Sequence, residues 1–551
     1  MSRSKQKNEN ISKDHKEEIS QKSRSKKNKH NTYNSLFHWQ SFRIKLVFEG
    51  IAVGIIAGFL IVLYRYSLEK AMEILNEVYK TLSLKPQLIP VWIGILALVG
   101  FIVGRMVKHE PMISGSGIPQ VEGVLLGKLK MSWWRVIAGK FIGGVLAIGS
   151  GLSLGREGPS VQLGAAVGQG FSKVFKRIKI EEKYLITSGA SAGLAAAFNA
   201  PLAGVMFALE EVHKNFSPLV LLSAISAALS ADFVSSGFFG LKPVFNFKNI
   251  SSLPLKYYFY IILLGVILGV LGVAFNKILL KTQVLYSKLK LIPKEFRIMI
   301  PLFISVILGL FLPQVLGGGH ELILSLTTSN APLTFLLVLF LVKFLFTMTS
   351  YGSGAPGGIF LPLLAIGALI GSIYGSVLVH FFNFDNIFIT NFIILAMAGY
   401  FTAIVRAPIT GTILITEMTG SFNHLLSIAM VSITAYIIAD ILGSKPIYES
   451  LLSRILHNQG SELIVGDNKN KAILEFAICM GSVLDGKEVK AVKWPSHCLL
   501  VAVKRGEQEI IPKGDTTIQS GDYLVVLTNE DRVSKINDAF IRMTKSREVQ
   551  K

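Results

Sequence analysis

Cysteine and charged residues are both scarce in this chain. Its 551 residues include only two cysteines, Cys479 and Cys498, which is too few for a disulfide framework or a cysteine-based metal site. Two lone thiols fit a reducing, cytosolic compartment. Charged residues make up 17% of the sequence, against about 25% in an average soluble protein. The deficit is concentrated between about Leu46 and Leu442, which indicates that this part of the chain lies in lipid.

Apolar runs stand where the charges are missing. Examples are 50–64, 88–104, 257–275 and 335–346. Several approach the roughly 20 apolar residues that a bilayer-spanning helix needs, and others are shorter. Lipid cannot satisfy the edges of an open sheet, so the spans are expected to be helices. The sequence therefore predicts a polytopic, all-α membrane unit over residues 45–458.

The net charge of +21 is no argument for nucleic-acid binding. Residues 1–30 carry ten Lys/Arg and four acidic residues without apolar periodicity. We expect residues 1–44 to be a disordered basic tail that stays cytoplasmic by the positive-inside rule. It has neither the short apolar core nor the cleavage site of a signal peptide. We expect no nucleic-acid partner.

The C-terminal part of the chain is polar again. We interpret residues 459–470 as a linker and residues 471–545 as a small α+β cytosolic domain. Short apolar stretches separated by turn residues predict four strands and one helix. The expected strands are 473–478, 499–505, 508–513 and 523–528, and the expected helix is 529–540, with Asn529 as its N-cap.

The membrane unit contains an internal repeat. Two similar segments run through Ala-Pro and end at Glu210 and Glu417, each glutamate ten residues after the alanine. A second similarity pairs 115–119 with 352–356. Repeats of this kind are common in transporters, where interrupted helices form the binding site near the bilayer midplane. The sequence alone leaves open whether the repeats are inverted.

Glycine and proline interrupt the apolar pattern at 115–119, 155–159 and 352–358. In a helix interior each glycine costs about 1 kcal/mol and each proline about 3 kcal/mol relative to alanine. At membrane depth such breaks are tolerated where the backbone lines a cavity. Helices that restart there direct free N–H groups and positive dipole ends at one point, which favours an anion. The alternative is that the glycines only permit close helix packing.

These motifs resemble those of the CLC chloride channel and transporter family. The matching segments are GSGIP at 115–119, GREGP at 155–159, GGIFLP at 357–362 and KPIY at 445–448. The resemblance implies two antiparallel repeats with broken, re-entrant helices, assembled as a homodimer with one pore per subunit. The implied filter residues are Gly115, Ser116, Gly117, Ile118, Pro119, Gly155, Arg156, Glu157, Gly158, Pro159, Gly358, Ile359, Phe360, Leu361 and Pro362.

The resemblance also implies roles for single residues. The hydroxyls of Ser116 and Tyr448 and the backbone N–H groups of Ile359 and Phe360 would bind chloride. Glu157 would be the outer gate, whose carboxylate competes with the anion and carries a proton. A structural ion pair of Glu157 with Arg156 is the alternative.

The resemblance to the CLC family also suggests roles in proton transfer and in the electrostatic field of the site. Glu211 stands where exchangers of the family carry an inner proton-transfer glutamate, which favours an exchanger over a channel. We interpret the matched Glu210 and Glu417 as structural, and Lys140 as part of the positive field around the site.

The soluble part resembles the C-terminal module of RCK/TrkA-type potassium-channel regulators over 481–528. Such modules dimerise, and some bind small ligands. Basic side chains at Lys490, Lys493, Lys504 and Arg505 suit an anionic ligand such as a cyclic dinucleotide. A solvated basic face on a passive dimerisation module is the alternative.

The sequence thus predicts a proton-coupled chloride antiporter, not an enzyme, in the cell membrane with both termini cytoplasmic. Chloride and protons are its substrates, and no cofactor or metal is expected. A passive voltage- or pH-gated chloride channel of the same fold is the alternative. A potassium-transport component is disfavoured because no TVGYG-like filter occurs. A membrane enzyme is disfavoured because no nucleophile–base pair or metal-ligand cluster occurs in the apolar region.

Overall fold

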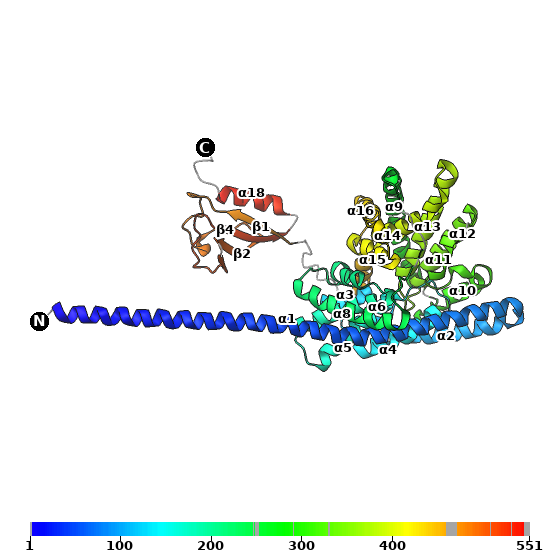
Figure 1. Ribbon diagram of the computed structural model, residues 1–551, viewed down its shortest axis with the longest axis horizontal. Helices are drawn as coiled ribbons and strands as arrows, with labels where there is room; N and C mark the ends of the chain where they lie inside the picture. Colours follow the sequence, from blue (N-terminus) through cyan, green and yellow to red (C-terminus); the bar gives the residue numbers. More distant parts are fainter. Residues whose placement is uncertain are drawn as a thin grey trace. The chain divides into compact units, whose positions relative to one another are not determined.

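The computed structural model divides into two compact units, residues 1–455 and 456–551 (Figure 1). It describes residues 3–245, 247, 253–289, 291–328, 331–458, 471–506, 508–529 and 532–544. Side chains of 3–42, 458, 471 and 534 are outside this description. The predicted disordered tail therefore falls almost entirely outside the described side chains, and the predicted linker at 459–470 falls outside the described residues.

The first half of the membrane unit consists of helices joined by short turns. They are α1 (Arg3–Leu84), α2 (Ile89–His109), α3 (Ile118–Leu125), α4 (Trp133–Gly149), α5 (Glu157–Val174), α6 (Lys179–Phe198), α7 (Pro201–Phe207), a π-helical segment (Ala208–His213) and α8 (Pro218–Phe239).

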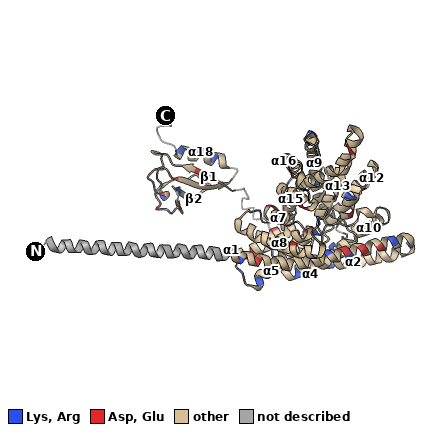
Figure 2. Cartoon of the chain, in the orientation of Figure 1, with Lys and Arg blue, Asp and Glu red and all other residues tan. Residues whose placement is uncertain are grey.

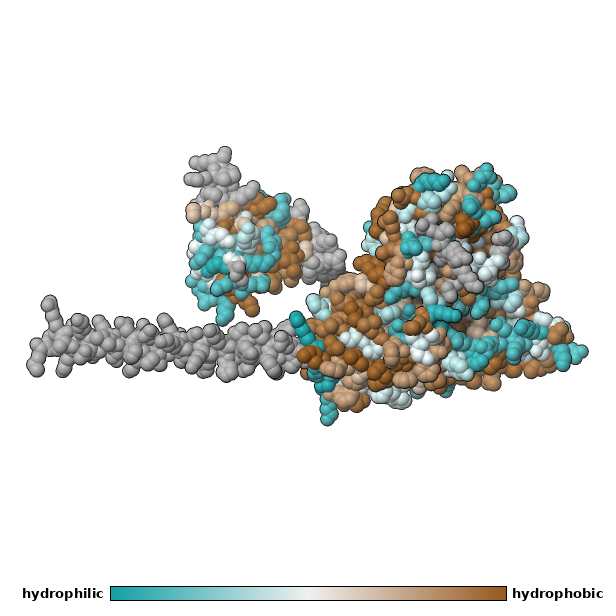
Figure 3. Space-filling model, viewed as in Figure 1, coloured by the Kyte–Doolittle hydropathy of each residue, from teal (hydrophilic) through white to brown (hydrophobic). Residues whose placement is uncertain are grey.

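The second half repeats this order. Its helices are α9 (Tyr258–Lys288), α10 (Met299–Phe311), α11 (His320–Thr328), α12 (Leu333–Gly352), α13 (Phe360–Phe382), α14 (Ile389–Val405), α15 (Pro408–Thr419) and α16 (Leu425–Ile441), followed by α17 (Ile447–Asn458). Within the described residues, eight helical stretches are long and apolar enough to cross a bilayer. Charged residues are sparse on these helices (Figure 2), and apolar residues cover much of the surface seen in Figure 3. The prediction of a multi-pass helical membrane unit is confirmed.

The two halves are inverted relative to each other. Gly50 of α1 contacts Ser223 of α8, and Gly58 contacts Ala231, so these two helices run parallel. Because α1 crosses the membrane starting from Arg43, α8 ends on the opposite face. The chain then enters α9 from that face, so the second half starts where the first half ended.

The repeat has a register that corrects one prediction. Gly155, Glu157 and Pro159 correspond to Gly358, Phe360 and Pro362, each 203 residues later, and Glu157 and Phe360 are the first residues of α5 and α13.

Backbone geometry shows which loop is the counterpart of GSGIP. The φ angles of Gly115 and Gly117 are +63° and +92°, and those of Gly317 and Gly319 are +61° and +97°. The counterpart is therefore the loop at 317–321. Pairing 115–119 with 352–356 was wrong, because GSG recurs at several turns. The two segments nevertheless lie side by side, as described below.

Glycine allows the central helices to pack at backbone distance. A Cβ on Gly164 of α5 would collide with the carbonyl oxygen of Gly189 of α6, and a Cβ on Gly189 would collide with that of Gly164. Small residues at helix crossings are typical of membrane proteins. The close packing of α5 on α6 fixes the position of the N-terminus of α5, where Glu157 lies.

The C-terminal unit is a four-stranded antiparallel sheet with strand order β1-β4-β2-β3. The strands are β1 (Lys471–Ala477), β2 (Cys498–Arg505), β3 (Gln508–Ile510) and β4 (Tyr523–Asn529), and the helix is α18 (Val533–Thr544). Phe476 stacks on Phe540 to join the sheet to the helix. The helix begins at Val533 rather than at the predicted Asn529. Asn529 pairs with Lys471 as the last residue of β4.

Candidate anion-binding site

The three broken motifs meet through backbone hydrogen bonds. Gly155 and Gly358 each donate an N–H to the other's carbonyl, both at 2.7 Å. The N–H of Gly357 donates to the carbonyl of Gly115 at 3.0 Å. Segments that lie 203 residues (155 to 358) and 242 residues (115 to 357) apart therefore form one loop cluster, and this cluster contains all three motifs that the sequence singled out.

Each motif places a helix N-terminus at this cluster. Gly117, with φ +92°, immediately precedes α3, and Pro119 occupies the first turn. Proline is favoured there because its missing N–H would have no partner in the helix anyway. A Cβ on Gly158 of α5 would lie 2.8 Å from the Cβ and the carbonyl oxygen of Ser116. Only glycine lets α5 begin this close to the first loop.

The donors expected to bind an anion lie at these N-termini. Ser116 is buried, and its Oγ accepts a hydrogen bond from the Ile118 N–H at 3.3 Å, with the Tyr351 hydroxyl also within hydrogen-bond reach. Ile359 caps α13 and Phe360 is its first residue. The first N–H groups of a helix have no partner within the helix. All three residues are buried.

Lys140 holds the loop at 113–117 by hydrogen bonds. Its fully buried ammonium donates to the carbonyls of Ile113 at 2.9 Å and Gly115 at 2.6 Å. In the second repeat, Lys343 donates in the same way to Val315 and Gly317. The lysine thus positions the loop that carries Ser116, and it brings a positive charge close to the site.

Glu157 lies at the centre of the cluster. Its side chain is fully buried. Among the described residues neither carboxylate oxygen makes a hydrogen bond of full geometry, but the backbone N–H groups of Glu157 itself and of Leu361 lie close enough to stabilise its charge. A Cβ on Gly155 would collide with Oε2 of Glu157 and lie 3.1 Å from the backbone nitrogen of Leu361. The carboxylate is therefore next to the N-terminus of α13. A buried, unpaired acidic group is costly unless its environment stabilises the charge or the group is protonated.

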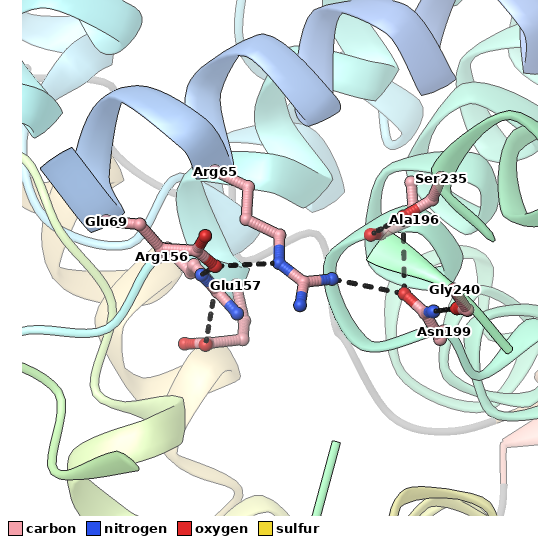
Figure 4. A network of polar contacts seen from close by, with 8 residues as sticks. All are labelled: Arg65, Glu69, Arg156, Glu157, Ala196, Asn199, Ser235 and Gly240. Carbon is pink, nitrogen blue, oxygen red and sulfur yellow. Dashed lines mark hydrogen bonds and ion pairs between the residues drawn. The ribbon is translucent and has the colours of Figure 1, made fainter. Parts of the chain in front are cut away.

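Arg156 is shared rather than committed to Glu157. Its Nε lies 4.0 Å from Oε1 of Glu157, whereas its Nη1 lies 3.2 Å from Oε1 of Glu69 on α1. Arg65 also donates to that oxygen of Glu69 at 3.0 Å and reaches Asn199 at 3.1 Å. Figure 4 shows Arg65 extending from Glu69 toward Asn199, with Arg156 and Glu157 beside them. The Arg156–Glu157 pair is therefore the looser of the two contacts of Arg156.

Tyrosine hydroxyls line the site from other helices. Tyr448, on α17, is fully buried, and its hydroxyl has no hydrogen-bond partner among the described residues. It lies within electrostatic reach of Glu157 and Glu211. Its ring packs edge-on against Phe207, whose ring also contacts Phe360. A buried hydroxyl without a partner suits a ligand that accepts a hydrogen bond.

Sequence reasoning missed three polar residues around the site. The hydroxyl of Tyr351 lies beside Ser116 and 3.2 Å from where a Cβ of Gly115 would be. Tyr64 is fully buried within electrostatic reach of Glu157. Glu69 holds Arg156. Tyr64 and Glu69 occur in an ordinary helical segment, and Tyr351 precedes a glycine turn, so no local pattern marks them.

The adjacent residues Glu210 and Glu211 have different environments. Glu211 is buried in the π-helical segment, and its Oε1 has no partner among the described residues. Its charged neighbours are Lys214 and Glu122, which pair at 2.7 Å, together with Glu210 and Glu449. Single π-helical turns inside helices occur frequently at functional sites.

Glu210 and Glu417 cap each other's repeat. The carboxylate of Glu210 accepts from the Thr410 N–H and hydroxyl, both at 2.7 Å, at the start of α15. That of Glu417 accepts from the Ala203 N–H at 2.7 Å, at the start of α7. Acidic groups at helix N-termini are stabilising. This reciprocal pattern follows from the two-fold relation between the repeats and agrees with the structural interpretation of the pair.

Comparison with known proteins agrees with this geometry. The profile of the voltage gated chloride channel family matches residues 95–440, which is more than half of the chain. The chain belongs to the CLC family. A TrkA-C domain profile matches residues 473–541.

Several relatives of this CLC protein are similar over most of their length. The H(+)/Cl(-) exchange transporter ClcA of Vibrio cholerae is 38% identical over 428 residues, 75% of this chain and 90% of the relative. ClcA of Salmonella paratyphi B is 36% identical, over 67% of this chain and 79% of the relative. A slow cyanobacterial Cl-/H+ antiporter of known structure has a TM-score of 0.72 and 32% identity, over 75% of this chain and 98% of that chain. A CLC-type fluoride/proton antiporter has a TM-score of 0.62 and 25% identity, over 74% of this chain and 97% of that chain.

The TrkA-C unit of this CLC protein holds most of its suspected ligand residues in local ion pairs. Arg505 donates to both carboxylate oxygens of Asp522 at 2.8 Å. Lys490 pairs with Glu488 at 2.8 Å, and Lys504 pairs with Glu475. Burial alone would raise the pKa of Asp522, but its hydrogen bonds with Arg505 and the Gln519 backbone hold that pKa below the usual value. Because these side chains are already paired, the basic residues are explained equally well by a solvated surface and by a ligand-binding site.

Proposed function

We propose that this CLC protein exchanges chloride for protons across the membrane. The observation that carries the proposal is the carboxylate of Glu157, which is fully buried where three broken motifs meet, beside the backbone N–H groups at the N-terminus of α13. Helix N-termini and backbone N–H groups favour a negative charge at this point. The Glu157 carboxylate and a halide ion would therefore compete for this binding site. When Glu157 is protonated, its side chain would leave the site and the anion would bind there. The relatives named as H(+)/Cl(-) exchange transporters support the same function.

The chloride ion would be bound by neutral donors. We assign the hydroxyls of Ser116 and Tyr448 and the backbone N–H groups of Ile359 and Phe360 to this task. The remaining filter residues shape the loops that carry these donors. Such a site has no full positive charge in direct contact, so the anion is held firmly enough to enter and loosely enough to leave. We expect no resident cofactor, because dipoles and one titratable carboxylate suffice for this chemistry.

Glu211 would carry the proton between Glu157 and the solution on the Arg43 side. Its burial and its unpaired oxygen support this role, as does its place next to the charged pair Lys214–Glu122. Both glutamates, which belong to different elements, lie within electrostatic reach of Tyr448. Proton and chloride paths would therefore meet at Glu157 and separate below it.

One experiment separates exchange from passive conduction. The protein is reconstituted in liposomes with a chloride gradient, and chloride and internal pH are followed together. An exchanger moves protons uphill as chloride runs down its gradient. Chloride flux with no proton movement against a gradient would instead identify a passive channel of the same fold.

Removing the Tyr448 hydroxyl should weaken chloride binding. Tyr448→Phe keeps the ring that packs on Phe207 but deletes a donor to a desolvated anion. Hydrogen bonds to charged groups contribute about 1.5–3 kcal/mol, so we expect chloride affinity by calorimetry to fall at least about tenfold. Tyr374→Phe is the matched control, because that hydroxyl donates to the Tyr260 carbonyl instead. Equal loss in both variants would place the anion elsewhere.

Removing the charge of Glu69 should shift the pH dependence of exchange to lower pH. In Glu69→Gln, Arg156 loses the partner that draws it away from Glu157. A closer guanidinium and one fewer neighbouring negative charge both favour charged Glu157, so more acid is needed to protonate it. The measurement is chloride flux against pH. The control is Glu73→Gln on the same helix, whose partner is Lys70. A shift toward higher pH in Glu69→Gln would contradict the arrangement.

We further propose that the Arg43 face is cytoplasmic and that the chain forms a homodimer. The loops and helix ends on that face are rich in basic residues, which supports the orientation by the positive-inside rule. These include Arg43, Lys45, Arg105, Lys108, Lys173, Lys176, Arg177, Lys179 and Lys183. α16 runs parallel to α9, because Gly265 contacts Thr434 and Gly269 contacts Ile438. Both helices therefore end on the Arg43 face, where α17 leads to the TrkA-C unit. Both termini would then be cytoplasmic.

The TrkA-C unit would regulate transport rather than perform it. Deleting 466–551 should preserve proton-coupled chloride exchange in liposomes and remove any response to a ligand, including a cyclic dinucleotide. The reason is that every residue of the candidate site lies in the membrane unit. Thermal shift of the full chain against a panel of nucleotides identifies the ligand. A truncated protein that folds and dimerises but exchanges nothing would overturn the regulatory role.

A further inference from the structure

An open hollow of about 640 Å³ lies between the C-terminal end of α2 and the N-terminal end of α4. Arg105 and His109 line it from α2, and Arg135 lines it from α4. Lys108 also lines it and pairs with Glu295. Among the residues the structure describes, neither Arg105 nor Arg135 forms an ion pair or a side-chain hydrogen bond. Among the described residues that line it, Glu110 is the single acidic one. Glu295 offsets the charge of Lys108, so Arg105 and Arg135 against Glu110 leave the hollow with an excess of positive charge.

The position of the hollow is that of a bilayer interface. α1 crosses the membrane away from Arg43 and α2 crosses back, so the hollow is on the Arg43 face. Trp134 stands at its rim with 56% of its surface exposed, and the Arg135 guanidinium lies 5.1 Å from the Trp134 ring centroid. Tryptophan is enriched where a membrane protein passes from hydrocarbon to headgroups.

Below the basic residues, both helices present apolar side chains to the outside. Ile102 lies one turn before Met106 of the hollow, and Ile142 one turn after Ala138. Residues four apart share a helix face, and both isoleucines are exposed. A molecule with an anionic head and an apolar tail would contact both the basic hollow and the apolar helix faces next to it. A free anion would contact only the basic hollow.

We propose that this hollow binds the phosphate headgroup of an anionic phospholipid from the leaflet on the Arg43 face. Arg105 and Arg135 would contact the phosphate, with His109 beside it, and an acyl chain would follow Ile102 and Ile142. Basic pockets between membrane helices on the cytoplasmic side suit such headgroups. The floor of the hollow includes Ile113, whose carbonyl accepts from Lys140, the residue that also holds the carbonyl of Gly115. The bound lipid would therefore touch the loop that carries Ser116.

The test measures binding and does not depend on transport. The purified full-length protein is delipidated in detergent and titrated with phosphatidylglycerol or phosphatidylcholine, and retained lipid is followed by native mass spectrometry. We expect preferential retention of phosphatidylglycerol. The double variant Arg105→Gln/Arg135→Gln should reduce its apparent affinity about 25-fold, since each basic side chain near an anionic surface contributes about fivefold.

Two comparisons make the test specific. Lys173→Gln/Lys179→Gln removes the same charge from the same face away from the hollow and should bind as the unaltered protein does. Arg105→Lys/Arg135→Lys keeps the charge and should retain lipid, which excludes a folding defect as the cause of loss. Equal affinity in the Arg→Gln variant and the unaltered protein would overturn the proposal. So would equal retention of the two lipids, or full displacement of lipid by inorganic phosphate at the same concentration.

Discussion

In Glu157→Gln, proton movement driven by a chloride gradient should fall to background while chloride flux continues. The amide has the shape of the carboxylate but neither accepts a proton nor carries the charge that competes with chloride at the helix N-termini. The flux should also lose its dependence on pH, because this dependence comes from protonation of Glu157. Simultaneous recording of chloride and pH in proteoliposomes measures both effects.

A buried carboxylate away from the site provides the control for this variant. Glu181 is buried and pairs with Lys45 at 2.9 Å on the Arg43 face. Glu181→Gln should therefore leave coupling intact, whatever it does to stability. Uphill proton transport that persists in Glu157→Gln would remove Glu157 from the proton path and with it the central assignment.

Glu211→Gln should also abolish proton coupling while sparing chloride movement. Unlike Glu157, this residue does not lie at the anion site, so its loss should leave chloride affinity and the pH dependence of the gate unchanged. The neighbouring Glu210→Gln is the matched comparison, one residue away. It should instead lower thermal stability, because Glu210 caps α15 and a lost cap costs roughly 0.5–2 kcal/mol.

The two-fold relation supplies a second control for this pair. Glu417→Gln removes the reciprocal cap on α7 and should lower stability by a similar amount without uncoupling protons. Thermal melts measure the stability of all three variants, and the proteoliposome assay measures their proton coupling. Coupling lost in Glu210→Gln but kept in Glu211→Gln would show that the proton path runs through the other member of the tandem.

Some features could be predicted because they depend on local composition. Membrane insertion follows from apolar length, and broken helices follow from glycine and proline where a helix should continue. The strands of the C-terminal unit follow from alternating apolar residues and turns. Its helix boundary was missed because Asn529 suits both an N-cap and a strand end, and pairing with Lys471 decides in favour of the strand.

The sequence by itself determined the membrane class, the glycine-rich breaks and, through motif resemblance, the place of Glu157 among them. Only the tertiary structure decided which loops are equivalent, because GSG recurs and register depends on which helices pack. It also decided that Arg156 is shared with Glu69, that Tyr64 and Tyr351 face the site, and that Glu210 and Glu417 cap opposite repeats. The physical reason is that these contacts join residues far apart in the chain, and backbone packing rather than local propensity sets the distance between them.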